Sequence, residues 1–494
     1  MVSAGKKSGW LMGCGSVLVV VGAVMVIFWP TIFFAQLKNM MILSETSTSF
    51  PIWREVPIPM YLECHMFNIT NVADILAGKN VTLEVVELGP YVYREEHTKV
   101  NLTWNDNSTI TFYNERFWHF EPELSNGSLS DIITSINPII VTVAYYMRHQ
   151  HPLLKIPVDV FMRMFHDDMF LSANVSSWLF DGIDDPILQI AERFPELPIN
   201  IPFDKFGWFY KRNGSMEYDG VFVMNTGASD FSQLGNLEMW RNSNRTLYRD
   251  ECGAVKGSTG ELWAPELGQP EVTIFAPDIC TYMTLAKNET ITILGIEGQK
   301  YVANDSVFDN GYKYPQMACY CDEVRDADCL PAGALNVSAC RFGAPAFVTF
   351  PHFLGLDPPY PSKVDGLKPT PDMTFSLALE MFTGMPLEVF AQLQINLLVR
   401  HIGEITINNQ LPDPDTLVPM FWFRQEVKIS DDYARLAKFA LNLRYYMPYG
   451  FYALTAIGVI LLIIGIWILM RKLLKSPDSP ILSGVSQEEL SSER

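Results

Sequence analysis

Two long uncharged runs, one near each end of the chain, constrain its fold more than any other feature. Residues 10–34 and 449–470 contain no Asp, Glu, Lys or Arg and consist mainly of apolar side chains. A helix rises about 1.5 Å per residue, so each run is long enough to cross a hydrocarbon core about 30 Å thick. Such runs are too long for a signal-peptide core, and the core helices of soluble proteins rarely stay uncharged on every face. The sequence therefore predicts two membrane-spanning helices.

Basic residues beside both runs predict the orientation of the chain. Lys6 and Lys7 precede the first run, and Arg471, Lys472 and Lys475 follow the second. Because Lys and Arg are in excess on the cytoplasmic side, both termini are expected there. We therefore expect cytoplasmic tails at 1–9 and 471–494, spans at 10–34 and 448–470, and a large ectodomain at 35–447. The C-terminal tail has no convincing acidic dileucine sorting signal, which favours the plasma membrane over the lysosome.

Glycosylation acceptor triplets support the same topology. All the Asn-X-Ser/Thr triplets lie between the two runs, and none lies in the tails. One triplet is weak evidence, but their spread along one compartment indicates a heavily glycosylated ectodomain. The candidate acceptors are Asn68, Asn80, Asn101, Asn107, Asn126, Asn174, Asn213, Asn244, Asn288, Asn304 and Asn336.

Six of the eight cysteines cluster between 252 and 340, which defines a candidate disulfide region. They are Cys252, Cys280, Cys319, Cys321, Cys329 and Cys340. Their spacing does not repeat the paired two-residue pattern of zinc ribbons, and an oxidising compartment favours disulfides over metal-ligating thiols. Six cysteines allow 15 pairings, and the sequence alone does not choose among them. Cys64 stands apart, and Cys14 in the first run is either an acylation site or a small packing residue.

The composition and motifs exclude several classes of function. The net charge of −19 does not suit nucleic-acid binding. The chain has no nucleophile-elbow, metalloprotease or phosphate-loop motif, so we expect no enzyme, no cofactor and no metal site. Gly9 and Gly13 are spaced for close helix packing, which is a weak indication of contact between spans or of a homo-oligomer.

The ectodomain mixes β-rich stretches with one helical segment. Runs of alternating apolar and polar residues bounded by Gly, Pro and Asn predict strands at 81–95, 108–122, 219–227, 271–277 and 289–304. Between 128 and 195 the apolar period lengthens to three and four, starting with Ile132 and Ile136. We therefore expect an antiparallel sheet system, closed or sandwiched, with two or three inserted helices, of which the first is started or kinked by Pro138.

Several stretches across the chain resemble the class B scavenger receptors. They are PMYLECHMFNITN (59–71), VVELGPYVYRE (85–95), FGWFYKRNGSMEYDGVFVMNTG (206–227), APDIC (276–280), PHFL (351–354), DGLKP (365–369), FTGMPL (382–387) and QINLLV (394–399). The resemblance covers nearly all of residues 1–470. It implies an α+β membrane protein, with a large antiparallel β-barrel ectodomain, an apical helical bundle at 128–195 and two terminal transmembrane helices.

The resemblance also implies a function and a disulfide pattern. Members of this family dock lipoproteins or other lipid carriers and let hydrophobic molecules pass through an apolar tunnel in the ectodomain into the membrane. For this chain the implied ligands are carotenoids, sterols or fatty acids. Carried over from the fatty-acid-binding members, the pairing is Cys252–Cys319, Cys280–Cys340 and Cys321–Cys329, which leaves Cys64 without a partner.

The helical segment is where carrier docking is expected. It gathers basic and histidine side chains in an otherwise acidic ectodomain, namely Arg148, His149, His151, Lys155, Arg163 and His166. Nearby acidic residues dilute this charge, so an ordinary solvated helix face is the alternative reading. The lysine pair of fatty-acid-binding members is replaced here by Met164 and His166, which mildly favours neutral ligands. A pH switch at His149 and His151 is a further hypothesis.

Two other classes of function remain open at this point. A trafficking receptor that carries a luminal protein is one, as in a lysosomal member of the family. A ligand-gated ion channel with two spans is the other, but a pore needs polar groups, and the second run offers only Thr455, a few glycines and Trp467.

Overall fold

The computed structural model describes residues 4–193, 203–265, 269–321 and 332–474. The chain divides into two compact units, residues 1–40 with 432–494 and residues 41–431. We call the first the helix pair and the second the β unit.

The helices and strands have these bounds. The helices are α1 (Ala4–Met41), α2 (Ser49–Arg54), α3 (Val72–Leu76), α4 (Pro138–Met147), α5 (Pro152–Arg163), α6 (Pro186–Arg193) and α7 (Asp431–Leu474). The strands are β1 (Met60–Ile69), β2 (Leu83–Trp104), β3 (Thr109–Phe120), β4 (Ile132–Ile136), β5 (Phe170–Asn174), β6 (Ile183–Asp184), β7 (Lys205–Phe206), β8 (Val221–Asn225), β9 (Leu237–Trp240), β10 (Glu271–Ala276), β11 (Thr281–Ile293), β12 (Ile296–Val302), β13 (Leu335–Asn336), β14 (Ala346–Thr349), β15 (Val364–Asp365), β16 (Ser376–Glu380), β17 (Pro386–Arg400) and β18 (Asp415–Lys428).

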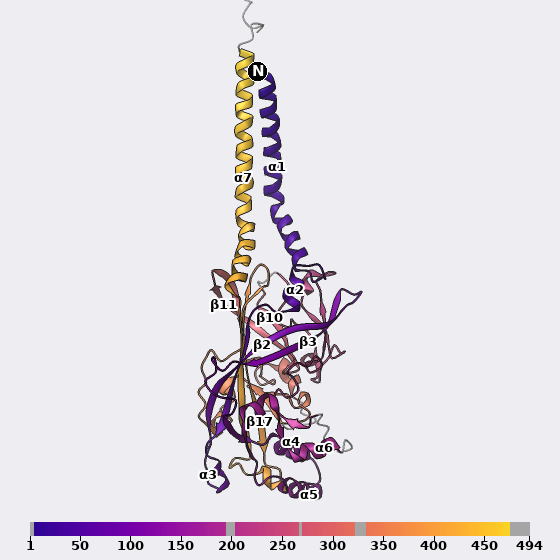
Figure 1. Cartoon of the computed structure of the whole chain (residues 1–494), viewed down its shortest axis with the longest axis vertical. Helices are drawn as coiled ribbons and strands as arrows, with labels where there is room; N and C mark the ends of the chain where they lie inside the picture. The colour runs from indigo at the N-terminus through magenta and orange to yellow at the C-terminus, as the bar shows by residue number, and fades with distance from the viewer. Residues whose placement is uncertain (1–3, 194–202, 266–268, 322–331, 475–494) are drawn as a thin grey trace, which may run out of the picture. The chain divides into compact units, whose positions relative to one another are not determined.

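Within the helix pair, α1 and α7 run side by side, as Figure 1 shows. Both are long and apolar enough to cross a membrane. Glycines bring the two backbones close together: a Cβ placed on Gly15 would lie 2.8 Å from the carbonyl oxygen of Gly458. The Ser8 hydroxyl donates across the pair to the carbonyl of Gly465 at 2.8 Å. A Cβ on Gly9 or Gly13 would meet nothing within 4 Å, so this contact does not use the Gly9/Gly13 spacing.

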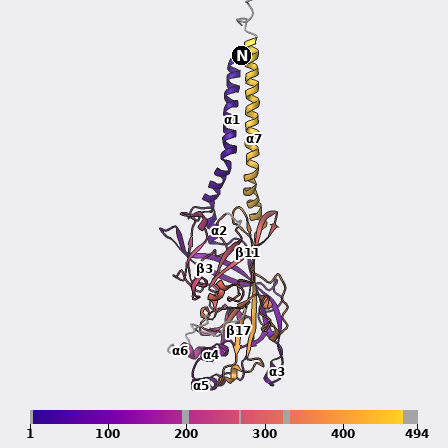
Figure 2. The same ribbon diagram turned by 180° about the vertical axis from the view of Figure 1, so that it is seen from behind.

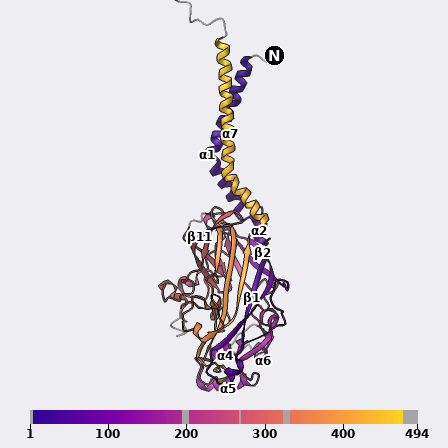
Figure 3. The same cartoon turned by 90° about the vertical axis from the view of Figure 1, so that its left-hand side faces the viewer.

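The β unit is built on one large, mainly antiparallel sheet. Its strands follow the order β10-β11-β12-β16-β17-β18-β1-β2-β3-β8-β9, and β13, β14 and β15 attach at its side. The long strands β1 and β2 lie next to each other in Figure 3, paired from Met60 with Glu95 to Ile69 with Val85. Inward residues of these strands, such as Leu62, alternate with exposed or half-buried ones, as the period of two requires.

One short segment nearly closes this sheet into a barrel. Ser258 bridges Asn236, next to β9, on one side and Ile274 of β10 on the other. Leu237 N–H donates to the Gly257 carbonyl at 2.9 Å, and Phe275 N–H donates to the Ser258 carbonyl at 2.8 Å. The two edge strands are therefore joined through this segment, which we call the seam (residues 257–258). The fold is the mixed helix and strand architecture with a barrel-like sheet that the resemblance implies.

The helical segment 128–195 differs from its prediction at one end. Ile132 and Ile136 were expected on a helix, but they lie in β4, which pairs with β5. The apolar spacing of three to four predicted the wrong element here. Ile133 and Ser135 are buried two positions apart, as on one face of a strand, and Ile136 is buried as well. Pro138 starts α4, and the Asn137 side chain caps it by accepting from the N–H groups of Ile139 and Ile140. Figure 2 shows α4, α5 and α6 gathered in one region of the β unit.

Candidate functional site

A mainly apolar cavity of about 140 Å³ lies inside the β unit. Its walls come from α4, from the stretch after residue 203, from the disulfide region and from the long strands of the sheet. A dry apolar cavity of about 150 Å³ is large enough for a ring the size of benzene. The cavity can therefore hold part of a hydrophobic molecule. The lining residues are Pro138, Ile139, Thr142, Leu188, Phe203, Lys205, Phe206, Gly207, Trp208, Phe209, Arg212, Tyr218, Asp278, Val337, Arg341, Phe342, Ala344, Ala346, Ile395, Leu397, Phe421 and Phe423.

Aromatic side chains form the main apolar wall of the cavity. Backbone hydrogen bonds from Trp208 N–H to the Trp178 carbonyl and from Phe209 N–H to the Leu179 carbonyl fix the turn that carries them. Phe421 of β18 then packs against both rings, with centroids 5.1 Å from Trp208 and 5.9 Å from Phe209. Such rings hold an apolar ligand by burial, at about 25 cal/mol per Å² of apolar surface.

A second wall of the cavity is charged rather than apolar. It is a buried ion network at one side of the cavity. Arg212, 5 % exposed, places one guanidinium nitrogen 2.9 Å from Asp219 and another 2.8 Å from Asp278. Burial alone would lower the pKa of Arg212, but the two carboxylates outweigh it and raise that pKa. Burial would likewise raise the pKa of Asp278, but Arg212 and Arg341 lower it to about 2. These groups are charged at neutral pH, so the cavity joins an apolar wall to a charged one.

The ion network belongs to a polar layer that crosses the interior of the barrel. Along β2 the inward side chains change from apolar, at Tyr91 and Tyr93, to Glu95, His97 and Lys99, all nearly inaccessible. Further along, Trp104 packs against a second apolar cluster built on Ile110 and Phe112, so two apolar clusters flank the layer.

The neighbouring strand β3 shows the same order in reverse. Asn114 and Arg116 pair in register with Lys99 and His97, between the apolar Phe112 and Trp118. The two strands agree, and they place charged groups between the apolar clusters.

Burial sets the protonation of this layer. It raises the pKa of Glu95, and it lowers the pKa of His97 well below its usual value, with the charges of Lys99 and Arg116 adding to that effect. His97 Nε2 lies 3.0 Å from the side-chain oxygen of Asn114, which suits a neutral imidazole donating there. Lys99 Nζ lies 2.9 Å from Glu261. The layer is therefore held together by ion pairs and hydrogen bonds rather than by apolar packing.

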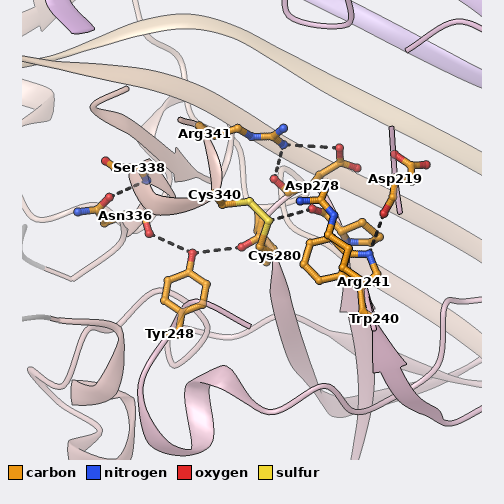
Figure 4. The surroundings of a disulfide bond; sticks show 12 residues. Asp219, Trp240, Arg241, Tyr248, Asp278, Cys280, Asn336, Ser338, Cys340 and Arg341 are labelled. Carbon is orange, nitrogen blue, oxygen red and sulfur yellow. Dashed lines mark hydrogen bonds and ion pairs between the residues drawn. A yellow bond between two sulfur atoms is a disulfide. The ribbon is translucent and has the colours of Figure 1, made fainter. Parts of the chain in front are cut away.

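Disulfides anchor the loops beside the cavity. The structure contains Cys252–Cys319 and Cys280–Cys340, two of the three pairs that the resemblance implies. The third, Cys321–Cys329, reaches outside the described residues, because Cys329 lies in 322–331. Figure 4 shows the surroundings of Cys280–Cys340, where the hydroxyl of Tyr248 lies 3.1 Å and 3.0 Å from the carbonyl oxygens of Ile279 and Asn336. This fixes the backbone that carries Asp278 and Arg341.

The two remaining cysteines are separate from this region. Cys64 is fully buried, and burial raises the pKa of its thiol, which makes it an unreactive packing residue. Cys14 is half-buried in α1.

The basic residues expected to dock a carrier are distributed over α4, α5 and the turns next to them. His149 and His151 are exposed, and the His151 ring accepts from the N–H of Leu153 at the start of α5. Arg163 is paired with Asp159 at 3.2 Å, and His166 lies 3.0 Å from Asp185 with a side chain only 14 % exposed. His166 therefore faces the protein.

Arg148 and Lys155 complete the expected docking set. The Arg148 guanidinium stacks on the ring of Tyr145, 3.7 Å from its centroid. Lys155 Nζ donates to the Arg148 carbonyl at 3.1 Å. The structure therefore brings Arg148, His149, His151 and Lys155 to one turn, and it places Arg163 and His166 against other elements.

Beside these residues, α5 exposes an apolar stripe that the sequence reading did not single out. Leu153, Ile156, Val160 and Met164 are each at least half exposed. Their spacing of three and four puts them on one face of the helix. The spacing of three and four can be read from the sequence, but buried positions on a helix have the same spacing. The exposed fractions of these side chains were needed to recognise the stripe.

Most candidate glycosylation acceptors are exposed. The exposed ones are Asn80, Asn101, Asn107, Asn126, Asn213, Asn244, Asn288 and Asn304. Asn68, Asn174 and Asn336 are half-buried, and their side-chain oxygens accept backbone N–H groups of Thr134, Ser177 and Ser338.

The polar layer and the cavity wall were missed by sequence reasoning. Glu95, His97 and Lys99 alternate with other residues along β2, and charged residues in an alternating strand are ordinarily placed on the solvent face. Among the described residues, no group of three His, Cys, Asp or Glu side chains is arranged to hold a metal ion.

Comparison with known proteins places this architecture in a family. Residues 13–469 match the model of the CD36 family. Protein peste of Drosophila melanogaster is 32 % identical over 410 residues, which is 82 % of this chain and 72 % of that protein. Scavenger receptor class B member 1 of Bos taurus is 31 % identical over 462 residues, or 92 % and 87 % of the two chains. Lysosome membrane protein 2 of Rattus norvegicus is 28 % identical over 444 residues, or 88 % of each. The chain is a two-span membrane protein and belongs to the CD36 family.

Proposed function

We propose that this protein is a scavenger-type receptor that takes hydrophobic molecules from a lipid carrier and passes them through the β unit into the membrane. The observation that carries the proposal is the apolar cavity walled by Phe206, Trp208 and Phe421. The similarity to scavenger receptor class B member 1 supports a receptor rather than an enzyme. Binding by burial needs no reaction chemistry, since each CH₂ removed from water contributes about 0.8 kcal/mol.

The proposal includes a place and an orientation. Both termini are cytoplasmic and the β unit is outside the cell at the plasma membrane, as the basic flanks and the exposed glycosylation acceptors favour. The turn that carries Arg148, His149, His151 and Lys155 is the docking region for the carrier, together with the exposed apolar stripe of α5. The transferred molecule is a lipid, with sterols, carotenoids and fatty acids as the classes to compare.

Filling the cavity tests the proposal. Ala344 lines the cavity and is only half-buried, so a larger side chain there enters the cavity without crowding the core. We expect Ala344→Trp to reduce uptake of a fluorescent sterol ester from lipoprotein particles severalfold in cells expressing the full chain, while particle binding at the surface stays unchanged. Ala344→Ser is the matched control, with surface expression measured for both. Unchanged uptake by Ala344→Trp at normal surface expression would contradict transfer through this cavity.

A further inference from the structure

Arg241 lies on the surface of the β unit without a carboxylate partner. Among the described residues, no Asp or Glu oxygen lies within ion-pair distance of Arg241, whose guanidinium donates to the Tyr218 carbonyl at 3.0 Å and stacks 4.4 Å from the Trp240 ring. Partial burial lowers the pKa of Arg241, and the positive charge of Arg341 lowers it further. The two arginines are therefore close enough to repel each other.

Arg341 has a carboxylate nearby, but that carboxylate is committed elsewhere. Asp278 lies 2.8 Å from Arg212 and 3.8 Å from Arg341, which is a long contact. Arg341 donates instead to the backbone carbonyl of Asp278. Its side chain is 30 % exposed, so its guanidinium keeps N–H groups for a further acceptor. Figure 4 shows Arg241 and Arg341 near Asp278, and we call these two arginines the arginine pair.

The ion network next to the arginine pair does not balance its charge. With the pair included, the network holds four arginines and three carboxylates, and burial raises the pKa of one of these carboxylates, that of Glu95. The chain as a whole has a net charge of −19, so this local excess of positive charge is unusual for it. An exposed positive excess attracts anions. The arginines are Arg116, Arg212, Arg241 and Arg341, and the carboxylates are Glu95, Asp219 and Asp278.

The backbone around the arginine pair is held in an uncommon conformation. Residues other than glycine rarely have a positive φ, and those that do gather at ligand-binding and active sites. The Cys280–Cys340 disulfide also ties down the residue before Arg341. Holding charged donors in place lowers the entropy lost on binding. The residues with positive φ here are Arg241 (+52°), Asn242 (+61°), Cys280 (+55°) and Phe342 (+56°).

An exposed aromatic ring lies beside these charges. Phe342 follows Arg341 directly and is 51 % exposed. Its ring packs edge to face against Phe203, with centroids 5.4 Å apart at 86°. The C–H groups of a sugar ring pack well on the electron-rich face of an aromatic side chain, whereas a small inorganic anion gains nothing from it. The combination therefore suits a sugar that carries a negatively charged group.

We propose that Arg241, Arg341 and Phe342 form a surface site for a sulfated polysaccharide, in which a sulfate group binds the arginine pair and a sugar ring packs on Phe342. Arginine makes strong charge-assisted hydrogen bonds to such oxyanions, and a sulfate has enough oxygens to accept from two guanidinium groups. The site needs no lipid in the cavity, so it lies beyond the proposed function. Only the place of the encounter, outside the cell, rests on that function.

Capture on a sulfated surface tests the site. The full chain in phosphatidylcholine nanodiscs would be passed over immobilised heparin and over the same heparin after chemical desulfation. At about 0.15 M salt the Debye length is about 8 Å, so mainly close contacts contribute. We expect binding to heparin, and binding to the desulfated chain that is about tenfold weaker or less. Arg241→Gln and Arg341→Gln should each weaken heparin binding about tenfold, as expected for the loss of a charge-assisted hydrogen bond.

Control variants separate the site from general charge and from folding. Arg94→Gln removes an arginine of similar exposure, 38 %, that is already paired with Glu96 and Glu121, and should leave heparin binding unchanged. Arg341→Lys keeps the charge and should retain most of the binding. Thermal unfolding shows whether each variant is folded. Phe342→Ala, at an exposed ring, should weaken heparin binding severalfold and serves if an arginine variant does not fold.

Three results would overturn the polysaccharide site. The first is equal binding to heparin and to desulfated heparin. The second is heparin binding that survives both glutamine substitutions and Phe342→Ala. The third is capture by phosphatidylserine vesicles but not by heparin, which would assign the arginine pair to lipid headgroups. None of these results bears on lipid transfer, which Ala344→Trp tests separately.

Discussion

Lys99 is the most deeply buried charge in the polar layer, and breaking its ion pair should have an unequal effect on its two partners. Its side chain is fully inaccessible, whereas that of Glu261 is 20 % exposed. Removing one partner of a buried pair typically costs about 3–5 kcal/mol, because the other charge is left uncompensated. In Glu261→Met, Lys99 keeps its charge in the interior, so the full penalty applies. In Lys99→Met, the remaining Glu261 can reach water, so we expect a loss of only about 1 kcal/mol.

The size of the effect follows from the size of the β unit. Unfolding entropy near 60 °C is about 2.1 cal/mol/K per residue, or about 0.8 kcal/mol/K for residues 41–431. Glu261→Met should therefore lower the Tm by about 4–6 °C, Lys99→Met by about 1 °C, and the double variant should return close to the parent. Intrinsic fluorescence of the full chain in nanodiscs measures all three.

An exposed ion pair is the control for this experiment. Glu251, with a side chain 80 % exposed, lies 3.3 Å from Lys256. Surface pairs contribute about 0–1 kcal/mol, so Glu251→Met should leave the Tm almost unchanged. Equal shifts for Glu261→Met and Lys99→Met, or no recovery in the double variant, would refute the reasoning that the lysine is the uncompensated charge.

Three further predictions concern the helix pair, the buried histidine and a disulfide. A Cβ on Gly458 would lie 2.8 Å from a backbone oxygen of α1, so Gly458→Val should reduce cysteine cross-linking between α1 and α7, while Gly13→Ala should not. Burial lowers the pKa of His97, so the unfolded state binds more protons than the folded state below the usual histidine pKa of about 6.5. The free energy of unfolding of the parent should therefore fall from pH 7.5 to 5.5. Chemical denaturation measures this dependence, and His97→Gln should flatten it. A flat profile in the parent would contradict it. Removing Cys280–Cys340, which spans 60 residues, by a double serine substitution should cost about 4 kcal/mol in denaturant unfolding, and a loss below about 1 kcal/mol would show that the bond constrains little.

Much of the fold could be predicted from local patterns, because those patterns record burial directly. Alternating residues at 81–95 and 108–122 correspond to β2 and β3, and Pro138 begins a helix with a polar cap before it. Patterns alone did not find β4, since a five-residue run has too few positions to separate a period of two from one near four. The disulfide partners needed the family resemblance, because spacing leaves many pairings open.

The candidate site was less predictable, because it depends on which face of a strand turns inward. Glu95, His97 and Lys99 look like solvent-facing residues until β2 pairs with β3 and residues far away in sequence supply counter-charges. Arg212 and Asp278, which both line the cavity, are 66 positions apart, and no local signal brings them together. Long-range pairing creates the chemistry of the cavity, and a single sequence does not contain that information in any one segment.

The seam at 257–258 has a consequence for the local stability of the barrel. Strands β17 and β18 are paired from Glu388 with Lys428 to Arg400 with Asp415, whereas β9 and β10 are joined, within the part of the chain that the structure describes, through a few backbone hydrogen bonds around Ser258. Each such bond contributes about 0.5–1.5 kcal/mol, so opening the barrel at the seam costs less free energy than separating β17 from β18. The amide protons around Ser258 should therefore exchange with solvent before those in the middle of β17 and β18.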